Sequence, residues 1–168
     1  IFLSCFCTVL SSSLCAFSFS LYHFSFRIQS LFYPDYGILS FMEQKIHGNT
    51  AGIRDSLLKQ MQSLYDMEQP TGVFLSRELL ESMAYFTGEI RREISVYISR
   101  GGKIADVSIG DGSTVSMPDM RLVRNIDRLC GVRCIHTHPN GSGYLSEVDL
   151  GTLNSMRLDA MCAVGVRE

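Results

Sequence analysis

The sequence predicts a single α/β domain in which a mixed β-sheet is flanked by helices and includes a β-hairpin. Three observations predict this class. At 168 residues the chain is long enough for one domain with a hydrophobic core and short for two. Segments with helical periodicity and segments with strand-like alternation follow one another along the chain. A Gly-Gly turn joins two alternating runs, at 93–99 and 104–110, as is typical of a hairpin.

A sharp change of composition near residue 42 divides the chain. Residues 1–41 carry only Arg27 and Asp35 as charges, hold eight of the ten phenylalanines and are rich in serine. This segment is therefore predicted to lie outside the fold, and residues 42–168 to form the domain. The favoured interpretation starts the protein at Met42, with the earlier residues translated from upstream DNA. A membrane-anchoring segment and an ordered extra segment are the alternatives.

Two helices are predicted before the hairpin. The stretch at 45–52 predicts a short strand and a turn, in which Asn49 and Thr50 are suited to capping the helix that follows. Pro70 ends that helix, and "GVFLS" after it is a possible strand. Ser76 is suited to capping the second helix.

Two strands and two helices are predicted after the hairpin. A short helix is expected at 119–130, after a loop or edge strand at 111–118. A strand is predicted at 132–136, a helix at 146–158 and a buried strand at 160–166.

Two histidines at the end of the strand at 132–136 form the main candidate site. Alternate side chains share one face of a strand, so His136 and His138 are expected to point the same way. Pro139 favours an extended backbone at the residue before it. Two imidazoles on one face can share a zinc ion, and Asp149 in the next predicted helix is the natural third ligand. Such a ligand set leaves a fourth position for water, as in catalytic zinc sites.

Two further residues fit the roles that hydrolysis requires beside a metal, a general base and a donor to the developing oxyanion. Glu93, at the head of the first hairpin strand, is predicted as the base if its strand lies beside the histidine strand. Ser146 is predicted as the oxyanion donor. Ser146 and Asp149 also fit an S-x-x-D capping box, which explains both residues without a metal. A metal site and a purely structural capped helix therefore both stay open.

The histidine segment resembles a family signature. "HTHP" followed by Ser146 and Asp149 is similar to the JAMM metallo-isopeptidase motif, H-x-H, then seven residues, then S-x-x-D. The resemblance implies zinc ligands at His136, His138 and Asp149. It further implies an oxyanion helper at Ser146 and an upstream glutamate as base, which Glu93 matches by its strand context alone. The implied activity is that of a zinc metallo-hydrolase acting on an amide or isopeptide bond.

A longer resemblance covers residues 42–168, about three quarters of the chain. "HGNTAGI", "EIRREISVYISRGGKIADVSIGD" and "RLCGVRCIHTHPNGSGYLSEVDLGTLNSMRLDAMCAVGV" resemble the N-terminal domain of an HflX-type GTPase, in the same order. The resemblance implies a cytoplasmic protein that binds the large ribosomal subunit and uses GTP and Mg²⁺ through a separate G domain. Members often have "IHTHL" where this chain has "IHTHP", so Pro139 moves the sequence toward the isopeptidase motif.

GTP hydrolysis by this chain itself is excluded, because the sequence contains no G-x-x-x-x-G-K-[S/T] motif. The expected function is therefore that of the binding and regulatory N-terminal domain of a ribosome-associated HflX-like GTP-binding protein, truncated before the G domain. The net charge of −2 provides no overall positive field for DNA. A membrane is an expected partner only if residues 1–41 belong to the protein.

Overall fold

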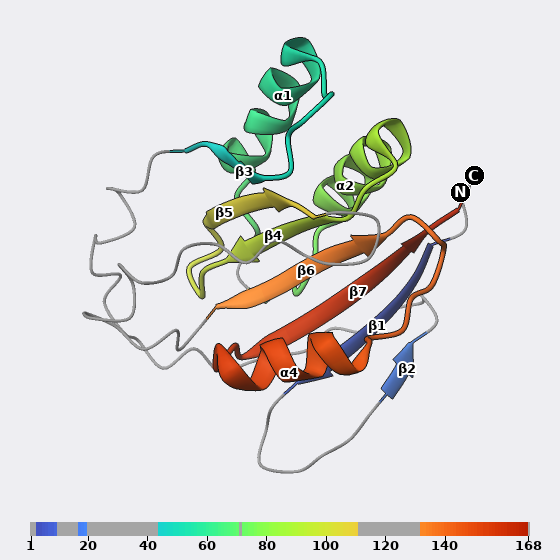
Figure 1. Cartoon of the computed structure of the whole chain (residues 1–168). Helices are drawn as coiled ribbons and strands as arrows, with labels where there is room; N and C mark the ends of the chain where they lie inside the picture. Colours follow the sequence, from blue (N-terminus) through green and yellow to red (C-terminus); the bar gives the residue numbers. More distant parts are fainter. Residues whose placement is uncertain (1–2, 10–16, 20–43, 71, 111–131, 168) are drawn as a thin grey trace.

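Five strands form a mixed β-sheet at the centre of the fold (Figure 1). The computed structural model describes residues 3–9, 17–19, 44–70, 72–110 and 132–167, the first two ranges by their backbone alone. The strands are β3 (Ile46–Gly48), β4 (Ile94–Ile98), β5 (Ile104–Ile109), β6 (Arg133–His138) and β7 (Ala160–Val166). Their order is β7-β6-β4-β5-β3; β3 is parallel to β5 and β6 to β7, whereas β4 is antiparallel to both neighbours. The predicted α/β class, mixed sheet and β4–β5 hairpin are confirmed.

The N-terminal segment adds backbone pairing at the β7 edge. β1 (Leu3–Val9) pairs antiparallel with β7, and β2 (Phe17–Phe19) pairs antiparallel with β1, which extends the sheet to seven strands. Most of residues 1–41 lie outside the described residues, so the interpretation of that segment stays a prediction. Within the described parts of the chain, none of the helices combines the length and the apolar character that crossing a membrane requires.

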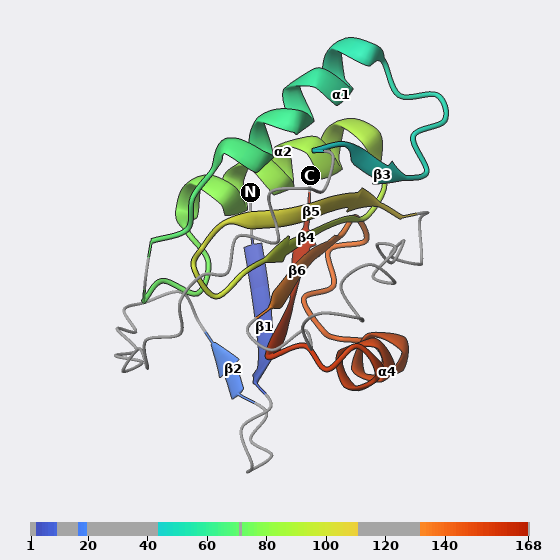
Figure 2. The same ribbon diagram turned by 90° about the vertical axis from the view of Figure 1, so that its left-hand side faces the viewer.

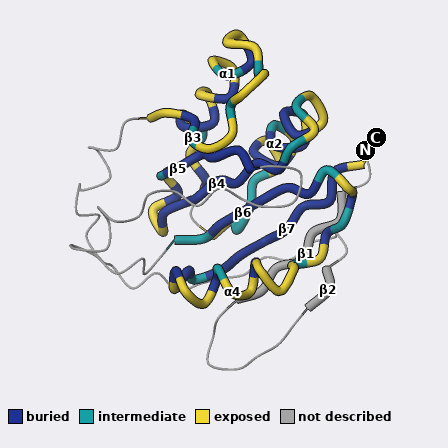
Figure 3. Tube along the Cα trace, in the orientation of Figure 1, coloured by how far each residue is buried: buried dark blue, intermediate teal, exposed yellow. Residues whose placement is uncertain are grey.

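Helices cover both faces of the sheet (Figure 2). One face packs against α1 (Asp55–Gln62), the 3-10 helix η2 (Ser63–Asp66) and α2 (Arg77–Ile90), and the other against α4 (Glu147–Ser155). Alternation along β4 directs Val96 to the larger core under α1 and α2, and Tyr97 to the smaller core under α4. Figure 3 shows the central strands buried while the outer side of α4 is exposed.

The predicted caps of the first helix are wrong. α1 begins at Asp55, and its N-cap residue, Arg54, makes no side-chain capping hydrogen bond. The side chain of Asn49 instead accepts a hydrogen bond from the backbone N–H two residues on, at 3.3 Å, and Thr50 lies in the same turn. Gly52, with φ of 76°, continues this turn, so the helix starts later than the capping pattern indicates.

The possible strand at "GVFLS" is also wrong, because this segment forms turns and bends before α2. The backbone N–H of Gln69 donates a hydrogen bond to Gly102 O at 2.8 Å, and the side-chain Oε1 of Gln69 accepts one from Ser76 N at 2.9 Å. The two hydrogen bonds hold the segment as a loop. Ser76 caps α2 as predicted, accepting from the backbone N–H three residues on at 3.2 Å. The predictions for 111–118 and 119–130 fall outside the described residues.

Candidate metal centre

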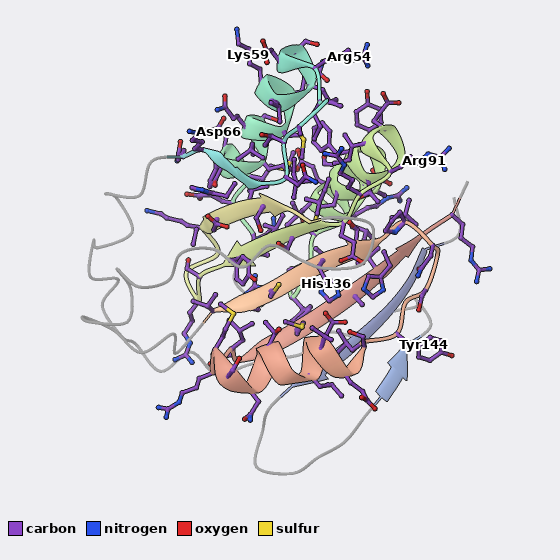
Figure 4. All side chains as sticks on the ribbon, in the orientation of Figure 1. Arg54, Lys59, Asp66, Arg91, His136 and Tyr144 are labelled. Atoms are coloured by element: carbon purple, nitrogen blue, oxygen red, sulfur yellow. The ribbon has the colours of Figure 1, made fainter. Side chains whose placement is uncertain are left out.

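β6 presents both histidines on the face of the sheet that α4 covers. His136 and His138 are buried, and their Nε2 atoms lie 3.0 Å apart, which confirms the predicted common orientation. Thr137, between them, points to the other face, where its hydroxyl lies 2.6 Å from that of Thr87 in α2. Figure 4 shows the labelled His136 on β6, on the α4 side. The period of two along a strand is therefore sufficient to bring the two rings together.

α4 brings Asp149 to the two imidazoles. Asp149 Oδ1 lies 3.4 Å from His136 Nε2, and Asp149 Oδ2 lies 3.9 Å from His138 Nε2. One ligand atom from each of the three buried residues lies within 4.8 Å of the others. Around a tetrahedral zinc ion with bonds of about 2.0–2.1 Å, neighbouring ligand atoms are about 3.3 Å apart. The three side chains thus form a buried group that could hold a metal ion after small ring movements.

The Asp149 carboxylate serves both the helix cap and the histidines. Its Oδ2 accepts hydrogen bonds from Ser146 N and Ser146 Oγ, each at 2.7 Å. Ser146 Oγ accepts in turn from Asp149 N at 3.2 Å, which completes the predicted capping box. Oδ1 is left to face His136. The capped helix and the ligand group are therefore compatible, because Oδ1, which faces His136, accepts neither of the capping hydrogen bonds.

The Ser146 hydroxyl directs its proton to Asp149 in this arrangement. To donate to a substrate oxyanion, the hydroxyl would have to turn away from the carboxylate. The role of Ser146 as oxyanion donor stays a prediction, whereas its contribution to holding Asp149 follows from the two hydrogen bonds.

The surroundings favour the carboxylate form of Asp149 and the neutral form of His138. Burial alone raises the pKa of Asp149, but the hydrogen bond and charge of His136, with hydrogen bonds from Ser146, outweigh burial and hold the pKa below its usual range. Burial lowers the pKa of His138, and the adjacent His136 lowers it further. A carboxylate and a neutral imidazole are the forms that bind metal ions.

The loop between β6 and α4 orients the His138 ring. His138 Nδ1 lies 2.9 Å from the Ser142 carbonyl oxygen. Because a carbonyl oxygen only accepts, Nδ1 is the donor and carries the proton, and in the neutral ring Nε2 keeps its lone pair. A hydrogen bond of this kind on the far nitrogen is typical of metal-binding histidines.

Two glycines let this loop lie against β7 beside His138. Gly165 is the register partner of His138 in the β6–β7 pair. A Cβ added to Gly165 would collide with the backbone of Gly141, which itself has φ of 78°. The close approach of the two backbones therefore requires glycine at position 165, and positive φ favours it at position 141.

Gly165→Ala is expected to destabilise the protein by about 1–3 kcal/mol, because the new methyl group must displace backbone. Gly151→Ala in α4 is the matched control, since an added Cβ there meets nothing within 4 Å. Alanine in a helix interior is expected to raise stability by about 0.5–1 kcal/mol. Urea unfolding measures both variants, and a Gly165→Ala protein as stable as the wild type would contradict the packing argument.

Glu93 lies beside the histidines, as its strand context indicates. β4 pairs antiparallel with β6, and Ser95 is the register partner of His136. Glu93 immediately precedes β4, is buried, and places Oε1 3.9 Å from His138 Nε2. The structure therefore brings the predicted base to the predicted ligands, while its chemical role stays a prediction.

A group of buried polar residues on the same face of β4 and β5 was not predicted from the sequence. Ser95 and Ser108 are fully buried, with their hydroxyl oxygens 2.7 Å apart. Asp106 is also buried, and its Oδ1 lies 3.5 Å from His47 Nε2. The signal was the regular alternation of polar residues in these strands, a pattern that normally indicates a solvent-facing side.

Asp106 is expected to make stability fall as the pH rises. Burial raises the pKa of its carboxyl group to about 6, although His47 acts in the opposite direction. The pKa of this carboxyl group in the unfolded chain is about 3.9. The stabilising contribution of Asp106 to folding is therefore fully present below about pH 4 and is lost as the pH rises through 6. Asp106→Asn is therefore expected to exceed the wild type by up to about 3 kcal/mol at pH 8 and to match it near pH 4. Urea unfolding across this range is the measurement, and identical pH profiles would contradict the expectation.

Fold and site together define a class of protein: an α/β domain with a buried His-His-Asp group, able to hold a metal ion, on one face of a mixed sheet. Glu93 and the capped start of α4 border this group. No family model, curated protein or solved structure matches the chain.

Proposed function

We propose that this chain is a zinc-dependent hydrolase that cleaves an amide or isopeptide bond. The observation that carries the proposal is the buried convergence of His136, His138 and Asp149, with Glu93 Oε1 3.9 Å from His138 Nε2. Two imidazoles and one carboxylate are a ligand set of zinc hydrolases, which keep the fourth position for water or substrate. The JAMM-like spacing of the same residues supports this chemistry.

The residues of the chain would have the following roles in the reaction. A zinc ion at the three ligands would supply a more acidic water and a polarised substrate carbonyl. Glu93 would take a proton from the attacking water and return it to the amine nitrogen as the carbon–nitrogen bond breaks. The Ser142 carbonyl would keep His138 in the tautomer that presents Nε2. The capping hydrogen bonds from Ser146 would hold the Asp149 carboxylate in place.

Metal content is the first test of this proposal. The purified full chain is expected to contain stoichiometric zinc by elemental mass spectrometry, and chelation is expected to lower its unfolding temperature, because the ion binds only the folded state. Fluorescence-quenched peptides joined by an α-peptide bond or by an Nε-lysyl isopeptide bond then show which bond is cleaved. A chain with no stoichiometric zinc and no response to chelation would end the proposal.

We also propose that the chain is the N-terminal binding domain of a cytoplasmic, ribosome-associated HflX-like GTP-binding protein. The support is that the three resembling segments lie on β3, on β4 and β5, and on β6 and β7 of one sheet. GTP and Mg²⁺ would be bound by a separate G domain, because this sequence has no P-loop. This proposal is compatible with a zinc hydrolase within the larger protein.

Co-sedimentation with purified ribosomal subunits tests the second proposal. The full chain is expected to sediment with the large subunit and to stay in the supernatant with the small subunit. Equal recovery with both subunits, or recovery with neither, would contradict it.

A further inference from the structure

His136 has a buried ring nitrogen that the ligand group does not use. Its Nε2 faces His138 and Asp149, whereas its Nδ1 is buried and has no hydrogen-bond partner among the described residues. To present a lone pair on Nε2, the neutral ring must carry its proton on Nδ1. A buried N–H without an acceptor is unfavourable, and metal-binding histidines normally donate this proton to a neighbour. His138 has such an acceptor in the Ser142 carbonyl, so His136 needs one of its own.

The hydroxyl of Ser95 is well placed to be that acceptor. Ser95 lies directly opposite His136 in the β4–β6 register and is fully buried. Directly opposed residues share a face of the sheet, with Cβ atoms about 4.5–5.5 Å apart. On its other side, Ser95 Oγ lies 2.7 Å from Ser108 Oγ of β5. A hydroxyl that donates to one neighbour keeps lone pairs for another donor.

We propose that Ser95 is a positioning residue of the metal centre, whose hydroxyl accepts a hydrogen bond from His136 Nδ1–H when a metal ion is bound. This inference rests on the proposed zinc site, and it adds a residue that the H-x-H and S-x-x-D signature does not contain. The two Nε2 atoms, now 3.0 Å apart, must separate to reach the spacing of about 3.3 Å between ligands of tetrahedral zinc. Metal binding therefore moves at least one ring, and the Ser95 hydrogen bond determines where the His136 ring comes to rest.

The competing explanation is that Ser95 only links β4 to β5 through Ser108. In that case Ser95→Ala would lower stability, because it removes one side of the 2.7 Å hydrogen bond to Ser108, and it would not change zinc affinity specifically. Zinc affinity and the stability of the metal-free protein must therefore be measured separately.

Zinc affinity of the full chain, measured by competition with a chromogenic chelator, is the first test. Ser95→Ala is expected to weaken zinc binding roughly 10- to 100-fold, the usual effect of removing the partner of a metal-binding histidine. Thr137→Val is the matched control, because it also removes a fully buried hydroxyl, from the residue between the two histidines but on the opposite face. Urea unfolding with excess chelator gives the metal-free stability of each variant. Unchanged zinc affinity in Ser95→Ala, or an equal loss in Thr137→Val, would overturn the inference.

Nuclear magnetic resonance of the zinc-loaded wild-type protein provides a readout that needs no variant to fold. We expect an exchange-protected His136 Nδ1–H resonance with a nuclear Overhauser effect to the β protons of Ser95. A zinc-loaded protein without this contact would overturn the inference while leaving the proposed hydrolase intact. A wild-type protein that binds no zinc would contradict both the role of Ser95 and the proposed zinc-dependent hydrolase.

Discussion

Asp149→Ala is expected to weaken zinc binding by more than about 100-fold, because it removes the anionic member of the described His-His-Asp group, whereas removal of an outer partner of a ligand costs about 10- to 100-fold. The same change removes half of the capping box and is expected to lower the metal-free stability by about 1 kcal/mol. Competition with a chelator and urea unfolding of the metal-free protein measure the two effects.

A matched control separates the two losses. Ser76→Ala removes the N-cap of α2, whose hydroxyl accepts from a backbone N–H at 3.2 Å, at a place unrelated to the histidines. It is expected to cost about 1 kcal/mol of stability with unchanged zinc affinity. If Asp149→Ala behaved like Ser76→Ala in both measurements, Asp149 would be only a helix cap.

Glu93→Gln is expected to reduce kcat/KM for the cleaved peptide by about 10²- to 10⁴-fold, the usual contribution of a general base. The zinc affinity is expected to stay close to that of the wild type, because His136, His138 and Asp149 are unchanged. Initial rates and the zinc competition assay, carried out on the same preparation, give both values.

Glu89→Gln is the control for the loss of a carboxylate near the end of α2. Glu89 is exposed and pairs with Arg54 at 3.7 Å, so its replacement is expected to leave the rate nearly unchanged. A Glu93→Gln protein with wild-type rates would exclude the role as base. Loss of zinc from the Glu93→Gln protein would show that Glu93 is a metal ligand and not the general base.

Local rules predicted the parts of the candidate site that lie close together in the chain. The period of two along β6 placed His136 and His138 on one face, and the capping pattern placed Asp149 in the first turn of α4. The same kind of rule failed for Asn49 and Thr50, because a turn with positive φ at Gly52 comes between these residues and α1. A cap is predictable only where the backbone before the helix is also predictable.

The polar residues of β4 and β5 show a second limit of local patterns. Ser95, Asp106 and Ser108 alternate with apolar residues, as they would in a sheet with one face in water. In the folded protein they are buried on the face of the sheet that carries the candidate metal centre. Alternation reports that the two faces of a strand differ in polarity, but the burial of the polar face depends on what packs over it.

The sequence by itself determined the α/β class, the hairpin and the orientation of the two imidazoles, because these follow from periods and turns within short segments. Only the tertiary structure decided that Glu93 lies 3.9 Å from His138 and that Asp149 accepts the capping hydrogen bonds with Oδ2 while its Oδ1 faces His136. These features depend on the pairing of β4 with β6 and on the packing of a loop against Gly165. Both are contacts between segments distant in the chain, and no local period encodes them.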